Sequence, residues 1–377
     1  MSKSLLILGN PTSIYIKQYI INVLYEKELD VYLGGNYDLS EEDKVFFSKF
    51  DVRYINLFKI EGIYKYLSKA GILLGYVQNL KNIKNGKFDY VHIHYIGNHR
   101  LMGYVYKIYK KIANKLILTF WGSDILDINQ KKAGYIKGLL KQSDTIVIPT
   151  IQMQTAFKKY FGDEFNCKIK PCLFGNPVVQ TYMDIKSDVD IIEQFIPIKL
   201  PDNKKVIAVG YNGSPRQNHF KILEILNSLP YEMKDNIFVL VQAGYGGTTD
   251  YKNDLKKYID KMSIDGAVLE KFIDVKETIA LKNRVDIFIH GQMTDALSSS
   301  VLEYILMGSF VLNPRWIQYD EWKALGIKYI EYDNFLDIRN IIINILENKV
   351  TKYHNEEIIE KNFSWEARKA EWQSLYE

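Results

Sequence analysis

The segment Leu5-Leu-Ile-Leu-Gly-Asn-Pro-Thr-Ser13 opens the chain with a short apolar run that ends in a glycine turn. Four consecutive apolar residues predict a strand that is buried on both faces, as strands of parallel sheets are. Residues 14–25 then carry apolar side chains at helical spacing, with Ser or Thr available as the cap. A buried strand that passes through such a turn into a helix begins a doubly wound α/β domain.

The same alternation of strand and helix continues as far as about residue 180, with no short repeat or low-complexity tract. Further strands are predicted at 31–33, 52–55, 90–94, 116–119 and 145–148, and the clearest helices at 64–82 and 101–114. Strands that alternate with helices favour a parallel sheet covered on both faces.

The alternation pauses near 173–177, passes an acidic stretch, and then begins again. The strand 206–209 leads through a glycine loop into a helix at 220–229, and later strands are predicted at 237–241, 285–289 and 310–312, with a helix at 301–307. Two such series predict two Rossmann-like domains. We assign them to residues 1–180 and 181–355, and expect a C-terminal helical segment, 356–377, to pack across both.

Composition narrows the class of protein. Of the 377 residues 47% are hydrophobic and 25% charged, which is typical of a globular chain rather than a disordered one. No apolar run approaches the roughly 20 residues of a membrane-spanning helix. Cys167 and Cys172 are too few and too close together for a disulfide framework or a zinc site. These features favour a cytoplasmic protein without a bound metal.

The charge is unevenly distributed. Residues 51–150 contain 16 Lys and Arg against 6 Asp and Glu, about +10, whereas the whole chain carries only +4. A basic region confined to one domain indicates an anionic surface as partner, and the inner face of the plasma membrane is the candidate. The alternative is an ordinary solvated helix face. We expect no nucleic-acid partner.

Ligands of doubly wound domains bind at the carboxyl ends of the strands, where loops open into helix N-termini that attract phosphate. Three loops have this form: Gly9–Ser13, Gly210–His219 and Asp295–Ser300. The glycine fingerprint of a dinucleotide site, G-x-G-x-x-G, follows neither first strand, and no P-loop is present. These absences argue against a nicotinamide-dependent oxidoreductase.

The segment Asp295-Ala-Leu-Ser-Ser-Ser-Val-Leu-Glu303 carries the strongest functional pattern. Two carboxylates eight positions apart enclose a loop of small residues that leads into a helix. Amides of residues 297–300 can hold a diphosphate, Glu303 can accept hydrogen bonds from ribose hydroxyls, and Asp295 can do the same for a sugar. An ordinary loop–helix passage with solvated carboxylates is the alternative.

This segment resembles the E-x7-E motif of retaining GT-B glycosyltransferases of the family-4 type, with Asp in place of the first Glu. Four other stretches resemble segments at the corresponding positions of that family: Gly9–Ser13, His92-Ile-His94, Thr119-Phe-Trp-Gly-Ser-Asp124 and Val209–His219. The resemblance implies two Rossmann-like doubly wound domains that face a central cleft. Trp121 stands where the family has His, and Asn218 or His219 stands where a phosphate-binding Lys is expected.

The departures are similar to those of a narrower group, the lipid-linked TDP-fucosamine transferases of enterobacterial common antigen. The Trp-Gly-x-Asp sequence, the glycine loop with Arg216, the Gly244-Tyr245 turn and the Val-Leu-Asn-Pro ending carry this likeness, over about residues 90–325.

The family resemblance implies roles for individual residues. We expect Asp124, Asp295 and His94 to be catalytic, and Trp121 and Asn98 to line the acceptor pocket. The predicted donor-binding residues are Gly9, Ser13, Gly213, Ser214, Arg216, His219, Gly244, Tyr245, Ser298, Ser299, Ser300 and Glu303.

Three of these roles keep an alternative. We take His92 and His94 to alternate across their strand, so that His94 alone reaches the cleft, although a structural role for His94 is equally open. Asp124 is either the polar catalytic group or the cap of the next helix. Trp121 is either a pocket wall or a catalyst, and we expect a wall, because indole does not exchange protons near neutral pH.

The implied activity is transfer of a hexosyl group from a UDP-, GDP- or TDP-sugar to a glycan or polyprenyl-linked acceptor in bacterial surface polysaccharide synthesis. No cofactor is expected, and the carboxylate pair favours retention of anomeric configuration. Two alternatives remain: a nucleotide-sugar epimerase of the same fold, and a catalytically silent GT-B partner subunit.

Overall fold

The computed structural model describes residues 2–35, 38–57, 68–83, 87–97, 102–188, 192–295 and 297–377. They form two units, Met1–Phe174 with Trp365–Glu377 and Gly175–Ser364. The first boundary falls earlier than the predicted residue 180. The C-terminal segment divides at Ser364, so that its first helix belongs to the second unit and its second helix to the first.

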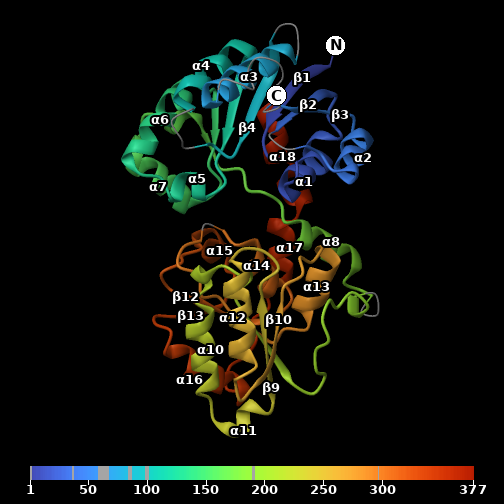
Figure 1. Ribbon diagram of the computed structural model, residues 1–377, viewed down its shortest axis with the longest axis vertical. Helices are drawn as coiled ribbons and strands as arrows, with labels where there is room; N and C mark the ends of the chain where they lie inside the picture. The colour runs from blue at the N-terminus through green and yellow to red at the C-terminus, as the bar shows by residue number, and fades with distance from the viewer. Residues whose placement is uncertain are drawn as a thin grey trace. The chain divides into compact units, whose positions relative to one another are not determined.

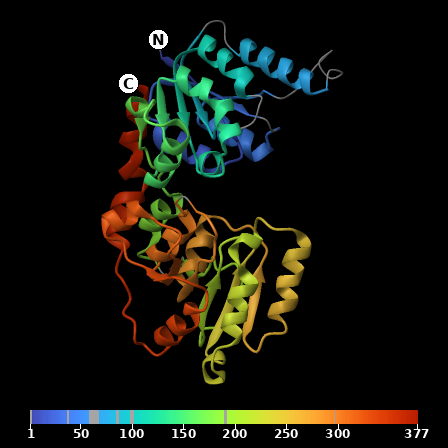
Figure 2. The ribbon, with the colours of Figure 1, turned by 90° about the vertical axis from the view of Figure 1, so that its left-hand side faces the viewer.

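The first unit contains a parallel seven-stranded sheet in the order β3-β2-β1-β4-β5-β6-β7, with helices on both faces (Figure 1, Figure 2). Its strands are β1 Lys3–Leu8, β2 Leu29–Gly35, β3 Val52–Asn56, β4 Phe88–His94, β5 Ala113–Thr119, β6 Thr145–Val147 and β7 Ile169–Lys170. Its helices are α1 Ile14–Tyr19, the π-helical turn η1 Ile20–Leu24, α2 Glu41–Lys49, α3 Ser68–Asn82, α4 Met102–Ile112, α5 Ser123–Leu126, α6 Gln130–Gln142, α7 Ile151–Phe161, η3 Asn166–Lys168, α18 Trp365–Gln373 and η5 Ser374–Tyr376.

The second unit contains a parallel six-stranded sheet in the order β10-β9-β8-β11-β12-β13. Its strands are β8 Lys205–Val209, β9 Ile237–Gln242, β10 Asp265–Leu269, β11 Ile287–Ile289, β12 Phe310–Pro314 and β13 Ile330–Tyr332. Its helices are α8 Pro177–Ile185, η4 Pro215–Gln217, α10 His219–Asn227, α11 Tyr231–Lys234, α12 Thr249–Ile259, α13 Val275–Asn283, α14 Ser299–Leu306, α15 Asp320–Leu325, α16 Asp337–Leu346 and α17 Glu356–Phe363.

Both sheets have the strand order of a Rossmann fold, which confirms the predicted fold class. The apolar runs form strands because each is buried from both sides, as the fully buried residues 206–209 illustrate. The predicted helix 101–114 is two residues too long, since Ala113 and Asn114 already pair within the sheet as part of β5. The short strands β7 and β13 and the polar-edged β10 were missed.

The segment that contains α18 and η5 completes the core of the first unit. Figure 1 shows α18, in red, among the blue elements that begin the chain. Trp365 and Trp372 are fully buried with α1 and η1, and the Trp372 Nε1 donates to the carbonyl of Leu173 at 2.7 Å. The Tyr376 hydroxyl lies 2.8 Å from the Tyr19 hydroxyl, and its carbonyl accepts from Tyr90. The sheet and these last residues therefore share one core.

Candidate functional site

The strand order places a topological switch point in each unit, between β1 and β4 and between β8 and β11. Loops on the two sides of such a point diverge, and the crevice between them is where doubly wound domains bind ligands. In the second unit the loop after β8 begins at Gly210 and the loop after β11 begins at His290. In the first unit the corresponding loops begin at Gly9 and Tyr95.

Two glycine-rich loops of the second unit contact each other through their backbones. Gly213 N donates to Tyr245 O at 2.7 Å. A Cβ on Gly247, whose φ is +68°, would lie 2.1 Å from the carbonyl oxygen of Gly213. A Cβ on Gly244 would lie 2.4 Å from the carbonyl oxygen of Lys271. Gly244 and Gly247 therefore leave no room for a side chain, and the predicted residues Gly213, Gly244 and Tyr245 lie where the two loops pack against each other.

The loop from Ser214 to His219 brings a cation to the same edge of the sheet. Ser214 caps the short helix η4, and the exposed Arg216 donates to the hydroxyl of Thr294 in the loop after β11. Asn218, at φ +56°, donates to the carbonyl of Gly291 at 2.7 Å. The loops after β8 and β11 are thus joined across the switch point by Arg216 and Asn218.

His219 is fully buried at the start of α10, where its Nδ1 lies 3.1 Å from the hydroxyl of Tyr251. Burial lowers its pKa to about 4, so the imidazole is neutral near pH 7. It supplies no positive charge where the family resemblance expects a lysine. Arg216 is therefore the cation of this loop.

The start of α14 is fixed by a buried lysine that sequence reasoning missed. Ser298 accepts a hydrogen bond from Val301 N as the N-cap. The Lys282 Nζ, on α13, donates to the Ser300 hydroxyl at 2.7 Å and lies 2.5 Å from Glu303 Oε2. Residues 282 and 303 are far apart in the sequence, and no spacing rule links them. Only the packing of α13 against α14 brings them together.

Glu303 is more enclosed than its predicted role requires. Its side chain is 8% exposed, and its second oxygen, Oε1, accepts from the Asn176 amide at 3.0 Å. Burial lowers the pKa of Lys282, and the Glu303 carboxylate opposes that shift. Both carboxylate oxygens thus already have a protein partner, although each retains a further lone pair. Glu303 is part of a buried charged network as well as a candidate ligand group.

Asp295 lies within a group of aromatic and imidazole side chains. The Tyr211 hydroxyl donates to Asp295 Oδ2 at 2.9 Å, and the His290 Nε2 lies 3.5 Å from the same oxygen. Burial, with the nearby carboxylate, raises the pKa of Tyr211 and of the fully buried Tyr319 far above the usual range. Both phenols therefore stay protonated. The sequence showed Asp295 but not these three neighbours.

In the first unit the predicted loop after β1 lies against β4. A Cβ on Gly9 would lie 3.5 Å from the His94 Cβ and 3.2 Å from Ile16, so a larger residue would crowd the end of the strand. Ser13 precedes α1 but makes no side-chain cap hydrogen bond. The predicted helix 14–25 is helical as far as residue 24, but only its first six residues, α1, are α-helical, and the remainder is the π-helical turn η1.

His92 and His94 do not lie on opposite faces, and the prediction that they alternate is wrong. Residues two apart on a strand share a face, and the two rings are 4.1 Å apart, both buried. The two nitrogens of His92 lie 2.7 Å from the hydroxyls of Tyr376 and Thr119. Neither nitrogen of His94 has a protein partner. The two side chains therefore lie on the same face of the strand, and they differ in that only His92 has hydrogen-bond partners.

His94 is enclosed by rings. Tyr19 and Trp121 meet it edge-on, and Trp372 stacks against it at 6.3 Å between centroids. Burial lowers its pKa to about 3. An imidazole of that pKa remains neutral near pH 7 and is a weak general base. Its chemistry there is that of a neutral hydrogen-bonding group.

Asp124 is fully buried beneath its own loop. Its Oδ1 accepts from the backbone N–H groups of Trp121 and Gly122, both at 2.9 Å, and its Oδ2 accepts from Ile96 N at 2.9 Å. Burial raises its pKa to about 6, although these hydrogen bonds oppose the shift. The geometry is that of a residue that shapes the loop after β5 and joins it to the loop after β4.

Trp121 is half-buried and contacts Tyr15 and Phe174 edge-on at 5.8 and 5.5 Å between ring centroids. Its indole Nε1 is buried without a hydrogen-bond partner. The Trp121 Nε1 and both ring nitrogens of His94 are thus polar atoms without hydrogen-bond partners. They lie among aromatic rings at the carboxyl ends of β4 and β5. Asn98, the other residue predicted for the acceptor pocket, lies outside the described residues.

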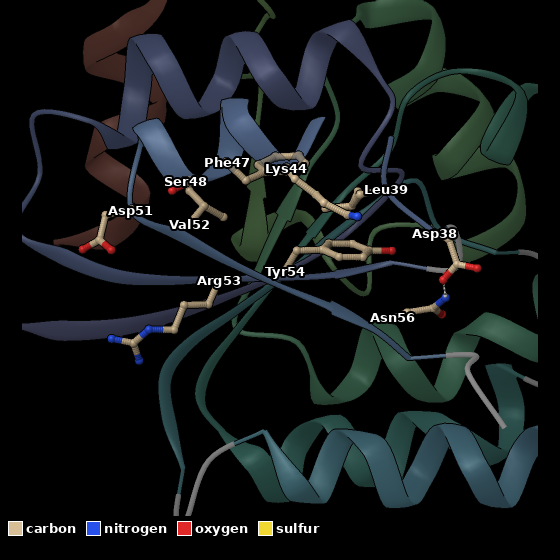
Figure 3. A pocket seen from close by; sticks show the side chains of 10 residues that line it. All are labelled: Asp38, Leu39, Lys44, Phe47, Ser48, Asp51, Val52, Arg53, Tyr54 and Asn56. Carbon is tan, nitrogen blue, oxygen red and sulfur yellow. Dashed lines mark hydrogen bonds between the residues drawn. The ribbon is translucent and has the colours of Figure 1, made fainter. Parts of the chain in front are cut away.

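A surface hollow of about 740 Å³ lies elsewhere, over α2 and the edge strand β3 (Figure 3). Its two basic residues have protein partners: Lys44 pairs with Glu41, and Arg53 with Asp30. None of the predicted site residues lines it, and it lies at an edge strand rather than at the switch point. We do not include it in the candidate site.

Within the described ranges, no group of three or more His, Cys, Asp and Glu side chains could hold a metal ion. Among the same residues, no helix combines the length and the apolar character that crossing a bilayer requires.

Comparison with known proteins agrees with this architecture. A family model described as "Glycosyl transferase 4-like" matches residues 4–150. No curated protein matches the chain. A glycosyltransferase from Rickettsia africae superposes with a TM-score of 0.71 at 14% identity, covering 100% of this chain and 98% of the other.

Two further solved structures cover 99% of this chain and 98% of their own, each with a TM-score of 0.68. They are HepE of Anabaena in complex with UDP-glucose, at 13% identity, and sucrose-phosphate synthase from Thermosynechococcus elongatus, at 12%. These likenesses, with the two parallel sheets, show the GT-B fold. The finer likeness to TDP-fucosamine transferases is not among them.

Proposed function

We propose that this chain is a glycosyltransferase that moves a hexosyl group from a nucleotide diphosphate sugar to a glycan or lipid-linked acceptor. One observation carries the proposal. At the switch point of the second unit, two glycine loops contact each other, and Arg216 and Tyr211 in the first of them donate to Thr294 and Asp295, in the loop that leads to α14. Backbone amides, a guanidinium and a helix N-terminus are the groups that bind a diphosphate.

The donor would be held by this set of loops. Amides of Ser298, Ser299 and Ser300 would contact the diphosphate, and Arg216 would neutralise the charge that builds up as the nucleotide departs. The amides of Gly213 and Ser214 already donate to Tyr245 O and Asn212 Oδ1, so these two residues would shape the loop that carries Arg216. Glu303 would receive the ribose through the lone pairs that Lys282 and Asn176 leave open, and Asp295 would bind the transferred sugar.

The acceptor would bind to the first unit, near the carboxyl ends of β4 and β5. Trp121 would form a wall against a sugar ring, and the neutral His94 would hydrogen-bond a hydroxyl rather than remove its proton. Asp124 would position this loop from beneath. Gly9 and Ser13 would face the donor, as in the family that the sequence resembles. The proposal includes no metal and no cofactor.

UDP is the first donor nucleotide to test, because HepE of Anabaena was crystallised with UDP-glucose and with UDP. The likeness of the sequence to TDP-fucosamine transferases makes TDP-sugars the second. That likeness also motivates a role in bacterial surface polysaccharide synthesis, with retention of configuration.

The test is release of nucleotide diphosphate from UDP- and TDP-sugars, measured with and without a polyprenyl-linked acceptor. Release that requires the acceptor supports the transferase, and NMR of the product anomer decides between retention and inversion. A changed sugar nucleotide without acceptor would instead indicate an epimerase. Absence of any reaction and of any nucleotide binding would contradict the proposal.

A further inference from the structure

The side chain of Asn313, at the end of β12, fixes the protonation of a neighbouring histidine. Asn313 is fully buried, and its Nδ2 donates to the carbonyls of Pro314 and Ile317 at 3.1 and 3.0 Å. Because an amide flip would turn its oxygen towards those two carbonyls, the orientation of the amide is determined. Its Oδ1 is thus an acceptor, and it lies 2.8 Å from the His290 Nδ1.

An acceptor at this position requires that Nδ1 of His290 carries the proton. In a neutral imidazole the other nitrogen, Nε2, is then a bare acceptor. His290 is fully buried, and Nε2 has no hydrogen-bond partner in the protein. The Tyr332 hydroxyl donates to the His290 carbonyl at 2.7 Å and holds the backbone at this point. The ring is therefore fixed from two sides with one free nitrogen.

The bare Nε2 faces a carboxylate. Asp295 Oδ2 lies 3.5 Å away, beyond the usual N–H···O distance of roughly 2.7–3.2 Å, and it accepts from Tyr211. The nitrogen therefore has no hydrogen bond to the carboxylate beside it, and a buried polar group without its hydrogen bond is unfavourable. Asp295 itself retains 14% exposure of its side chain, which leaves an approach from the surface.

We propose that His290 and Asp295 together bind hydroxyl groups of the transferred sugar, and that His290 Nε2 is a specificity-determining acceptor. This inference rests on the proposed function. Neighbouring hydroxyls of a pyranose are donors that can satisfy both acceptors at once, and a site built to bond a hydroxyl discriminates against sugars that lack it. Tyr211 and Asn313 are positioning residues, since they act through Asp295 and His290.

The first experiment determines the tautomer in the free protein. Long-range ¹H–¹⁵N correlation spectra of the protein labelled at histidine nitrogens, with the His290→Asn variant used for assignment, report which nitrogen carries the proton. We expect a protonated Nδ1 and a bare Nε2 near neutral pH. A protonated Nε2, either as the other tautomer or as an imidazolium paired with Asp295, would overturn the inference whatever the protein's activity.

The second experiment separates the sugar from the nucleotide. Calorimetry compares UDP with UDP-glucose, UDP-galactose and UDP-N-acetylglucosamine, and the sugar that most increases wild-type affinity over UDP is kept. An asparagine at 290 retains a polar group near Nδ1 but none near Nε2, whereas a glutamine can reach the Nε2 position. We expect His290→Asn to reduce the gain from the sugar by roughly 3- to 10-fold, the effect of one hydrogen bond, and His290→Gln to restore part of it.

UDP affinity and the thermal midpoint serve as internal references, and His354→Gln, at an exposed histidine, is the matched control. A sugar gain that His290→Asn leaves unchanged would overturn the inference while the proposed function stands. An equal loss of UDP and UDP-sugar affinity would assign His290 a structural role and also overturn it. If the wild-type protein binds none of these nucleotides, both the inference and a UDP-sugar donor fail together.

Discussion

The two switch points have the same strand order but different chemistry. In the first unit the candidate residues are surrounded by rings: His94 lies between Tyr19, Trp121 and Trp372, and its nitrogens have no partner. In the second unit they are joined by charges and hydrogen bonds, as in the Lys282–Glu303 pair. One topology thus supports a buried aromatic cluster in one unit and a buried ion pair in the other. The side chains, and not the strand order, distinguish the two units.

The largest effect is expected from Glu303→Ala. Removal of the carboxylate leaves the Lys282 charge buried without a counter-ion, and breaking a buried pair costs about 3–5 kcal/mol of unfolding free energy. The variant should therefore lose stability as well as nucleotide affinity, which we expect to fall by at least about tenfold. Urea denaturation and calorimetry measure the two effects.

Replacing both partners with apolar residues, as in Lys282→Met with Glu303→Leu, should restore much of that stability without restoring nucleotide binding. Lys257→Met, which breaks the exposed pair with Asp254, should change stability by less than about 1 kcal/mol. A Glu303→Ala protein that is as stable as the wild type would show that Lys282 finds other compensation.

A variant that lacks His94 should differ from the wild type in how its free energy of unfolding depends on pH. The folded pKa of His94, about 3, lies below the value of about 6.5 in an unfolded chain. The unfolded state therefore binds a proton first as the pH falls. The stability linked to the neutral form is complete above pH 6.5 and is lost between about pH 6.5 and 3. His94→Phe should remove this term, and at pH 4 should be more stable relative to wild type than at pH 7 by up to about 3 kcal/mol.

Chemical denaturation at pH 7, 5.5 and 4 tests this expectation, with His354→Phe as the exposed control. A pH profile of His94→Phe that parallels that of the wild type would mean that His94 has the same pKa in the folded and unfolded protein. Burial among the rings would then not shift the pKa of this histidine.

Arg216→Ala should lower turnover about 100-fold, or 2.7 kcal/mol, if the guanidinium stabilises charge on the departing phosphate. Because that charge develops in the transition state, kcat should fall more than donor affinity. Steady-state kinetics provide the measurement, with the sugar nucleotide that gives acceptor-dependent release in the test of the proposed function. Thr294→Val removes only the hydroxyl that accepts from Arg216 and should have a smaller effect. Normal turnover in Arg216→Ala would remove the residue from the site.

The smallest effect concerns docking of the first unit on an anionic membrane. Lys107 and Lys111 are exposed on α4, and each is expected to contribute about 1 kcal/mol against acidic lipid. Their joint replacement by Glu should reduce binding to vesicles rich in phosphatidylglycerol by roughly 30-fold or more at low salt. Lys349→Glu, on the second unit, is the control. Equal binding to neutral vesicles would contradict an electrostatic mode.

The sequence also predicts that tyrosines next to the lysines of the two basic helices lie at the membrane interface, namely Tyr64, Tyr66, Tyr76, Tyr104, Tyr106 and Tyr109. This prediction is wrong for Tyr76 and Tyr109, because both are buried, with their hydroxyls 2.7 Å apart. Lys110 pairs with Asp144 and is not a free cation. Lys69, Lys81, Tyr104 and Tyr106 lie in described helices, but their side chains, like residues 64–66, lie outside what the structure describes.

The fold could be predicted because its signal is local. An apolar run followed by glycine and a capped helix specifies one strand–loop–helix step, and repetition specifies the domain, so β1 and β8 were placed almost to the residue. The missed strands are those without such a run: β10 starts with Asp265 and Gly266 at the sheet edge, and β7 has two residues.

The sequence predicts the loops of the candidate site but not the side chains that contact those loops. Gly213, Gly244 and Asp295 follow strand ends, which a sequence displays directly. Lys282 and His290 are connected to the site only through packing and hydrogen bonds between different elements, and neither has a motif. The sequence therefore predicts Glu303 as a ligand group but gives no sign of its buried counter-ion.

The C-terminal segment imposes an order on how the chain can be assembled. Residues 175–364 form one continuous unit, whereas the first unit requires Trp365, Trp372 and Tyr376 to complete its core. On the ribosome the second unit can therefore fold before the first has received its last elements. A folded second unit also holds residues 174 and 365 together, which lowers the entropy cost of closing so long a loop. Until then the side of His92 and His94 that Trp372 and Tyr376 cover in the folded protein stays open to water.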